Sequence, residues 1–375
     1  DQISTRRLRI VKYRGTTHGT NEYPFLIDED GFSVLPLSSL GLDHKVSSER
    51  ISSGIPRLDS MLGGKGFYRG SSVLLSGTAG TGKTSLAAHF AAETCNRGER
   101  CLYLAFEESP SQLMRNMKSV GIDLEPHAKK GLLKLHASRP TLHGLEMHLV
   151  QMHKMVEEFE PTVVVVDPIS NFVNAGSAQD ALTMLLRLTD YLKSRQATAM
   201  FTHLSSGGVG GAALENTDLG VSSLIDTWIL LRDIELGGER NKGIYILKSR
   251  GMKHSNQIRE YLLTPEGIQL EAVYIGPEGV LTGSMRAAQE ARERAAQIER
   301  SEETSRKQRD LERRRLALEA QIASLRPEFK ATEEEEAQIA KETQVRERVI
   351  ADARDAAGKR RGADHSEAAP PARKR

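Results

Sequence analysis

The chain has 375 residues, of which 38% are hydrophobic and 27% are charged. At ~150 residues per domain, this length predicts two domains or one domain with an extension. Its 52 Lys and Arg residues nearly balance its 50 Asp and Glu residues, for a net charge of +2, so bulk charge favours neither a nucleic acid nor a membrane as partner.

The lack of a recognisable targeting signal and the small number of cysteines favour a cytoplasmic location. No apolar run approaches the ~18 residues that a membrane span needs, and the first ten residues, DQISTRRLRI, lack the apolar segment of a secretory signal. Cys95 and Cys101 are the two cysteines, which is too few for a disulfide framework. We therefore expect a cytoplasmic protein.

Composition divides the chain into four segments. Residues 1–50 hold short apolar runs separated by Gly, Thr, Asn and Asp, whereas residues 51–275 hold nearly all of the longer hydrophobic runs. Residues 284–358 are dense in Glu, Arg, Ala and Gln, and residues 359–375 are poor in hydrophobic residues and rich in Pro and charge. We expect a linker segment, a main globular domain, a helical extension and a disordered tail, in that order.

The first segment contains an echo of a later one. Residues 10–18 read IVKYRGTTH, and residues 246–254 read ILKSRGMKH. Two interpretations remain open: a coincidence between two short strand-turn segments, or a module repeated in tandem, with residues 1–35 as the tail of the earlier copy. The matching pairs are Lys12 with Lys248, Arg14 with Arg250, Gly15 with Gly251, and His18 with His254.

The main domain alternates short apolar strands with helix-length segments. Strands are predicted at residues 73–76, 101–105, 132–136, 163–166 and 198–202, because each run is apolar and partly β-branched. After about residue 224, successive strands without helices predict an antiparallel extension. The sequence therefore predicts an α/β fold with a central, mostly parallel sheet. The clearest helix carries one apolar stripe of Leu142, Leu145, Leu149, Met152, Val156 and Phe159.

A phosphate-binding loop directly follows the first predicted strand of that domain. The motif GxxxxGK[ST] lies between the strand VLLS and a helical stretch, which is the context it requires. Lys83 is expected to reach the β- and γ-phosphates of a nucleotide, and the Thr84 hydroxyl to ligate Mg²⁺. The backbone and helix start cradle the phosphates. The expected contact residues are Gly77, Thr78, Ala79, Gly80, Thr81, Gly82, Lys83, Thr84 and Ser85.

Carboxylates end two of the other predicted strands. Asp167 ends the strand VVVV and is expected to hold the metal, often through water; the alternative is a plain strand-end Asp. Glu107 and Glu108 end the strand CLYLAF, where open α/β sheets bind ligands. Glu107 is the favoured catalytic base and a metal contact, with Glu108 beside it, whereas the alternative is that both cap the next helix.

The ordered set of motifs resembles the KaiC family of RecA-like P-loop ATPases over residues 50–275. The resemblance is carried by SGIPRLDSMLGGKGFYRGSSVLLSGTAGTGKT, the FEES run, QLMRN, VVVVDPIS, and SSLIDTWILL followed by LKSRG. It implies a hexameric ring with ATP and Mg²⁺ between neighbouring subunits, autokinase and autophosphatase activity in a second module, and a KaiB-like clock partner.

The resemblance also assigns individual residues. Ser222 and Ser223 match the phosphoacceptors, with Thr217 as an auxiliary hydroxyl; the alternative is that they are ordinary loop residues. The family usually has Ser-Thr at the acceptor pair, so the two serines leave the order of phosphorylation open. Lys248 and Arg250 match basic residues that act on the neighbour's nucleotide, beside Ser249 and His254; the alternative is an exposed basic strand.

The extension carries a heptad pattern. Leu311, Leu318 and Leu325 repeat every seven residues, Ile322 and Phe329 fall four after the last two, and Ile339 is in phase. We expect a coiled coil that joins chains, and with it two rings, or else a single solvated helix. Pro327 is expected to kink or break the helix.

A DNA-directed recombinase or motor on the same fold is the main alternative function. It needs basic or aromatic residues in the loop that faces the ring pore. The candidate loop, SSGGVGGAALENTD, has neither, so the sequence favours the autokinase.

Overall fold

The computed structural model describes residues 6–28, 31–34, 46–205, 220–236, 238–276 and 279–360. It divides into two compact units, Asp1–Gln289 and Glu290–Arg375. The first unit contains the sheet and all the predicted site residues that the structure describes. The second consists, in its described part, of helix only.

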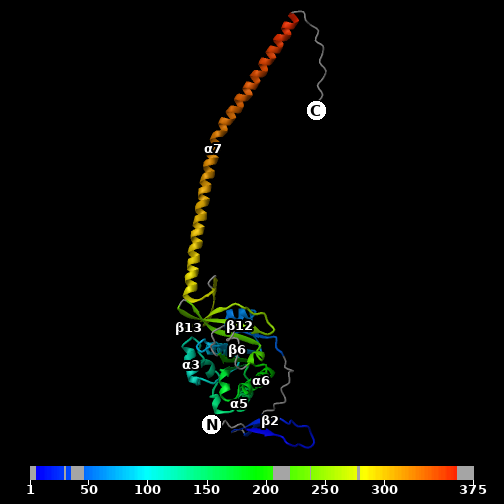
Figure 1. Cartoon of the computed structure of the whole chain (residues 1–375), viewed down its shortest axis with the longest axis vertical. Helices are drawn as coiled ribbons and strands as arrows, with labels where there is room; N and C mark the ends of the chain where they lie inside the picture. Colours follow the sequence, from blue (N-terminus) through cyan, green and yellow to red (C-terminus); the bar gives the residue numbers. More distant parts are fainter. Residues whose placement is uncertain are drawn as a thin grey trace. The chain divides into compact units, whose positions relative to one another are not determined.

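A nine-stranded sheet forms the frame of the first unit, with strand order β14-β13-β12-β11-β6-β10-β9-β7-β8. Figure 1 labels β6, β12 and β13 of this sheet. The six strands from β11 to β8 run parallel, and β12, β13 and β14 extend the sheet antiparallel. This confirms the predicted α/β class, its mostly parallel sheet and its antiparallel extension. The strands are β6 (Ser72–Gly77), β7 (Cys101–Ala105), β8 (Leu133–Ala137), β9 (Val163–Asp167), β10 (Thr198–Leu204), β11 (Thr227–Leu236), β12 (Glu239–Ser249), β13 (Arg259–Thr264) and β14 (Gly267–Ala272).

Helices cover both faces of this sheet, because alternate residues of each buried strand point to opposite sides. On β6, Val73 and Leu75 enter one core with α1, α2 and α3, and Leu74 enters a second core with α5 and α6. The helices are α1 (Pro56–Met61), α2 (Lys83–Asn96), α3 (Pro110–Lys118), α4 (Glu125–Lys129), α5 (Leu145–Phe159) and α6 (Ala178–Ser194), with short turns η1 (Pro140–Leu142), η2 (Ile169–Asn174) and η4 (Val221–Ser223).

The predicted stripe of α5 is confirmed except at its first member. Leu145, Leu149, Met152 and Val156 are buried, whereas Leu142 is 65% exposed and lies in η1. The helix begins only after Gly144, because the extended backbone of that residue separates η1 from α5.

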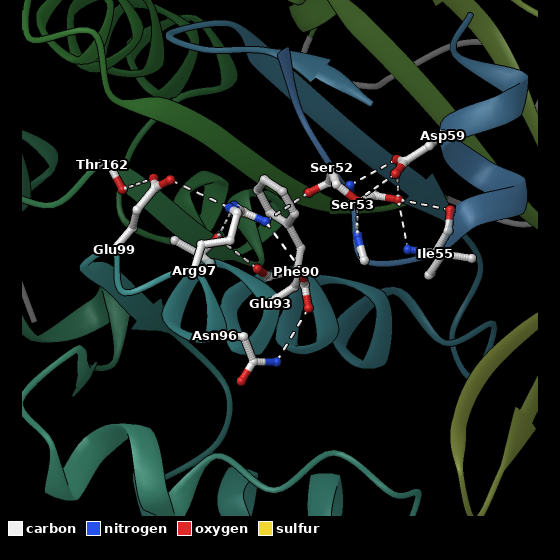
Figure 2. A network of polar contacts seen from close by, with 12 residues as sticks. Ser52, Ser53, Ile55, Asp59, Phe90, Glu93, Asn96, Arg97, Glu99 and Thr162 are labelled. Carbon is white, nitrogen blue, oxygen red and sulfur yellow. Dashed lines mark hydrogen bonds and ion pairs between the residues drawn. The ribbon is translucent and has the colours of Figure 1, made fainter. Parts of the chain in front are cut away.

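A polar network fastens the segment before β6 to the far end of α2 (Figure 2). Arg97, at the C-terminal end of α2, donates to the carbonyl of Ser52 at 3.1 Å and faces Glu99 at 3.5 Å. Asp59 of α1 accepts hydrogen bonds from the side chains of Ser52 and Ser53 at 2.5 and 2.7 Å. The network therefore fixes the direction of α2, the helix whose N-terminus carries the phosphate loop.

Three small sheets complete the first unit. They are β1 (Arg7–Arg9) with β2 (Glu22–Asp28) and β3 (Gly31–Val34), β4 (Arg50–Ile51) with β5 (Phe67–Tyr68), and β15 (Tyr274–Gly276) with β16 (Gly279–Leu281). The hairpin β2–β3 pairs Phe25 with Val34 and Asp28 with Gly31, as β13–β14 pairs Tyr261 with Leu270 and Thr264 with Gly267. Both hairpins thus have the same register at the same spacing as the sequence echo, which argues against coincidence.

Helix α7 runs from Gly283 to Arg360 and includes the predicted extension. It continues through Pro327 and bends about midway along its length in Figure 1, so the chain kinks without breaking. None of its residues is buried. Each predicted seam residue is more than half exposed: Leu311, Leu318, Ile322, Leu325, Phe329 and Ile339.

Candidate functional site

The phosphate loop joins β6 to α2, as the motif predicts. Gly82 precedes the first helical residue at φ +96°, and no side chain caps this helix start. The free backbone N–H groups and the helix dipole therefore point toward a bound anion. Tyr261 of β13 donates from its hydroxyl to the Gly82 carbonyl at 3.1 Å, and a Cβ at Gly82 would lie 2.7 Å from its ring. Sequence reasoning missed this residue.

Lys83 is buried beside the loop that it serves. Its Nζ donates to the carbonyls of Gly77 and Thr78 at 2.9 and 2.7 Å. Burial lowers the pKa of Lys83, and the nearby carboxylates of Asp167 and Glu107 oppose that change. An anionic ligand that replaces two neutral carbonyls would make stronger, charge-assisted hydrogen bonds to this ammonium group.

Asp167 is held by two hydroxyl groups that sequence reasoning missed. Tyr103 of β7 donates to one carboxylate oxygen at 2.6 Å, and Thr202 of β10 donates to the other. Burial raises the pKa of Tyr103 well above its usual value, so its hydroxyl stays protonated and can donate. The available signal was a polar side chain within each of two buried, mainly apolar strands.

The two glutamates after β7 diverge. Glu107 is exposed and accepts a hydrogen bond from Asn171 of η2 at 3.1 Å, whereas Glu108 lies 3.4 Å from the side-chain nitrogen of Asn116 of α3. The interpretation that the glutamates cap α3 is wrong, because Ser109 forms the capping box of that helix. Glu107 thus remains available on the nucleotide side of the sheet.

An oxygen-rich donor set surrounds the loop. Thr84, Glu107 and Asp167 offer hydroxyl and carboxylate oxygens, which are the ligands that Mg²⁺ prefers. Asp167 is already fixed by its two hydroxyl donors, as second-shell partners fix metal-binding carboxylates. These residues therefore fit a hard cation such as Mg²⁺.

The predicted phosphoacceptors lie together with the predicted basic pair. Ser222 and Ser223 end η4, and Ser223 is exposed. Lys248 donates to the carbonyl of Ser222 at 2.7 Å, and Arg250 donates to that of Ser223 at 2.6 Å. A cavity of about 580 Å³ is lined by Ser222, Ser223, Trp228, Leu247 and Lys248.

The remaining predicted contacts are less closely joined to this group. Ser249 lies 3.2 Å from the Thr227 hydroxyl, and His254 is exposed beyond the end of β12. Thr217 lies outside the described residues.

The register of β11 on β6 separates the acceptor group from the phosphate loop of the same chain. Thr227 at the start of β11 pairs with Val73, and Leu231 pairs with Gly77 at the end of β6. At ~3.3 Å per residue, Thr227 and Gly77 are therefore ~13 Å apart along the strand direction. The acceptor serines precede Thr227 and the phosphate loop follows Gly77. The serines and the phosphate loop of one chain therefore lie at opposite ends of the parallel strands.

The chain is similar to several known proteins over most of its length. The KaiC ATPase family model matches residues 51–273. The circadian clock protein KaiC2 of Synechocystis sp. is 50% identical over 335 residues, which is 89% of this chain and 59% of the relative. The clock oscillator protein KaiC of Parathermosynechococcus lividus is 39% identical over 279 residues, which is 74% of this chain and 51% of the relative.

A third relative has similar coverage. The clock protein KaiC3 of Synechocystis sp. is 38% identical over 285 residues, covering 76% of this chain and 56% of the relative. The chain thus spans between half and three-fifths of the length of these curated relatives. Among the described residues, no helix combines the length and apolar character needed to cross a membrane.

Proposed function

The chain belongs to the KaiC ATPase family, and from that premise we propose that it is an ATP-dependent serine autokinase and autophosphatase, with ATPase activity, that acts in a clock or timer. The observation that carries the proposal is that the acceptor serines and the phosphate loop of one chain lie at opposite ends of the parallel strands. Acceptor serines that cannot reach their own phosphate loop need the nucleotide of another subunit, which favours a ring with ATP at its subunit interfaces.

The proposed transfer uses groups from two neighbouring chains. In the nucleotide-binding chain, Lys83 would leave its two carbonyls for the β- and γ-phosphates. Thr84 and Asp167 would hold Mg²⁺, which would neutralise charge that develops on the phosphoryl group. The hydroxyl oxygen of the neighbour's Ser222 or Ser223 attacks the γ-phosphorus in line, its proton passes to Glu107, and the bond to the ADP oxygen breaks. Glu108, which lies beside Asn116 of α3, is the second proposed catalytic carboxylate.

The neighbouring chain also supplies cations. Its Lys248 and Arg250 already lie beside the acceptor serines, where they can stabilise charge on the transferred phosphoryl group. Ser249 and His254 are proposed contacts to the same nucleotide, and Thr217 is a proposed auxiliary acceptor. Dephosphorylation uses the same constellation in reverse or with water as the acceptor.

A subunit-mixing experiment tests this arrangement. One chain carries Lys83→Ala, which removes nucleotide binding, and a second, tagged chain carries Ser222→Ala and Ser223→Ala. The two are co-expressed and incubated with γ-labelled ATP and Mg²⁺. Label is expected on the Lys83→Ala chain alone, and phosphopeptide mapping should place it on Ser222 or Ser223.

The controls separate the possible failures. A sample in which every chain carries Lys83→Ala should stay unlabelled. Labelling of the wild-type chain without labelling of the mixed rings would refute transfer between chains. DNA-stimulated ATP turnover with no label on protein would instead support the recombinase or motor alternative.

Domain organisation and partners form the last part of the proposal. Residues 1–50 are the tail of a preceding module with its linker, which the matched registers of the two hairpins support, and residues 51–275 are the catalytic domain. Residues 284–358 pair with other chains as a coiled coil that joins two rings, since a helix with an exposed apolar seam lacks a buried face of its own. A KaiB-like clock protein is a proposed partner, and a cytoplasmic location is proposed on the same premise.

A further inference from the structure

A partly buried carboxylate, that of Asp226, follows the acceptor serines by three residues. Asp226 sits just before β11, and its side chain is 20% exposed. One carboxylate oxygen, Oδ2, accepts from the backbone and the hydroxyl of Ser72 at 2.9 Å each and faces Lys193 Nζ at 2.8 Å. The position of Asp226 is therefore fixed by β6 and by the last turn of α6, independently of the acceptor segment.

The other oxygen of this carboxylate faces Arg250, one of the predicted basic residues. The distance from Oδ1 to a guanidinium nitrogen is 3.7 Å, and the Arg250 side chain is 50% exposed. The backbone N–H of Arg250 donates to the Asp226 carbonyl at 2.8 Å. The backbone of Arg250 is thus held by Asp226, while its half-exposed guanidinium donates to the neutral Ser223 carbonyl at 2.6 Å and lies 3.7 Å from the Asp226 carboxylate. A phosphoryl group on Ser223 would be a stronger acceptor for this guanidinium than the carbonyl.

Positive charge is in excess around the acceptor serines. Lys193 and Arg250 face the Asp226 carboxylate, and Lys248 donates to the Ser222 carbonyl close by. Among the described residues of this group, three positive charges therefore accompany one carboxylate, an excess of two. Burial lowers the pKa of Lys248, and the neighbouring Arg250 lowers it further, as expected where cations outnumber carboxylates. A phosphoserine carries nearly two negative charges at pH 7, which matches this excess.

A second cavity is lined in part by these charged groups. It measures about 580 Å³, and its lining includes Lys193, Asp226 and Arg250. Arg69 also lines it, but that guanidinium is paired with Glu49 and Glu99. The cations available to a phosphoryl group at Ser223 are therefore those that face Asp226.

We propose that Asp226 and Lys193 are positioning residues for Arg250. Asp226 holds the guanidinium beside Ser223 before transfer, and Lys193 compensates the Asp226 carboxylate once Arg250 has turned to the phosphoryl group on Ser223. The role rests on the proposed function, since it needs a phosphoryl group on the acceptor serine. It extends that function by naming the groups that stabilise the phosphorylated serine.

The test measures the phosphate itself. Phosphoserine is introduced at position 223 of the full chain by genetic encoding, so that autokinase activity is not required, and its second pKa, ordinarily ~6, is followed by phosphorus NMR as a function of pH. Lys193→Met is expected to raise this pKa by about 0.5 or more, because the uncompensated Asp226 carboxylate reclaims Arg250. Asp226→Asn removes the carboxylate that competes for Arg250, so this variant is expected to have a phosphoserine pKa equal to or lower than that of the chain with Asp226.

A second background separates positioning from plain electrostatics. In chains that also carry Arg250→Gln, Lys193→Met is expected to raise the phosphoserine pKa by less than half as much. Equal effects in the two backgrounds, or no effect of Lys193→Met in either, would overturn the proposal. Lys134→Met is the matched control, because Lys134 pairs with Glu158 at 3.8 Å on another part of the surface, and it should leave the pKa unchanged.

The outcomes remain distinguishable from those of the proposed function. If labelled ATP never phosphorylates the serines but the encoded phosphoserine behaves as expected, the autokinase proposal fails and the charge arrangement stands. If Lys193→Met does not fold, Asp226→Asn alone decides, because a rise in the phosphoserine pKa in that variant contradicts the proposal.

Discussion

Tyr103→Phe is the most direct probe of how Asp167 is held. Tyr103 is fully buried, and its hydroxyl lies 2.6 Å from a carboxylate oxygen. A hydrogen bond to a charged group contributes ~1.5–3 kcal/mol, and phenylalanine keeps the ring and therefore the packing. Because Thr202 still donates to the other oxygen, we expect the free energy of unfolding to fall by about 2 kcal/mol.

The same substitution should weaken the binding of ATP selectively when Mg²⁺ is present. Loss of ~1.4 kcal/mol of positioning corresponds to a tenfold weaker dissociation constant, whereas binding in EDTA should stay within about twofold. Urea unfolding of the nucleotide-free chain and isothermal titration with and without Mg²⁺ measure the two effects. Tyr191→Phe, which removes a longer hydrogen bond to His153 at 3.5 Å, is the control. An equal loss of affinity in both titrations would refute a role of Tyr103 through Asp167.

Three further changes have definite expectations. Gly82→Ala should lower the free energy of unfolding, measured in urea, by more than ~2 kcal/mol and abolish ATP binding. The reason is that the new Cβ would lie 2.7 Å from a tyrosine ring. Gly98→Ala is the control, because Gly98 has a similar φ of +81° with open space around it, and this change should cost only ~1 kcal/mol. Glu99→Gln should cost up to roughly 3 kcal/mol at pH 7, because the hydrogen bond from Arg69 lowers the pKa of Glu99 from 4.5 to about 2. Since a lowered pKa stabilises the fold above pH 4.5, the difference from wild type should shrink as the pH falls below 4.5 and vanish near pH 2, as followed by urea unfolding. A chain that ends at Gln289 should bind ATP normally but form smaller particles by light scattering; an unchanged particle mass would contradict the coiled coil.

Much of the nucleotide side of the site follows from the sequence because parallel strands end at a common edge. The phosphate loop, Glu107 and Asp167 each follow an apolar run, so their positions could be predicted from strand ends alone. Tyr103 and Thr202 could not be assigned in this way. Their contact with Asp167 depends on β9 lying between β7 and β10, and local sequence does not encode the order of strands.

The errors and omissions have the same origin. The apolar spacing placed Leu142 on the α5 stripe, but the extended backbone at Gly144 ends the preceding turn and reorients the chain. Lys193 and Asp226 are 33 residues apart in sequence, and only the packing of α6 under the edge of β11 brings them to 2.8 Å. Periodicity predicts which face of an element is apolar, whereas contacts between charged residues require the tertiary arrangement.

The arrangement of charges also supports the proposal that the transfer reaction uses groups from two chains. Lys83 at one edge of the sheet lies among carboxylates, including Asp167 and Glu107, which suits a bound triphosphate and its cation. Lys248 and Arg250 lie at the opposite end of the parallel strands, beside the acceptor serines, and among the described residues the carboxylate next to them is that of Asp226, which is already paired with Lys193. This group suits a phosphoryl group, but its carboxylate is poorly placed to accept the serine proton. Under the proposed function, each end of the strands therefore supplies what the other lacks, and two chains in contact would complete the reaction.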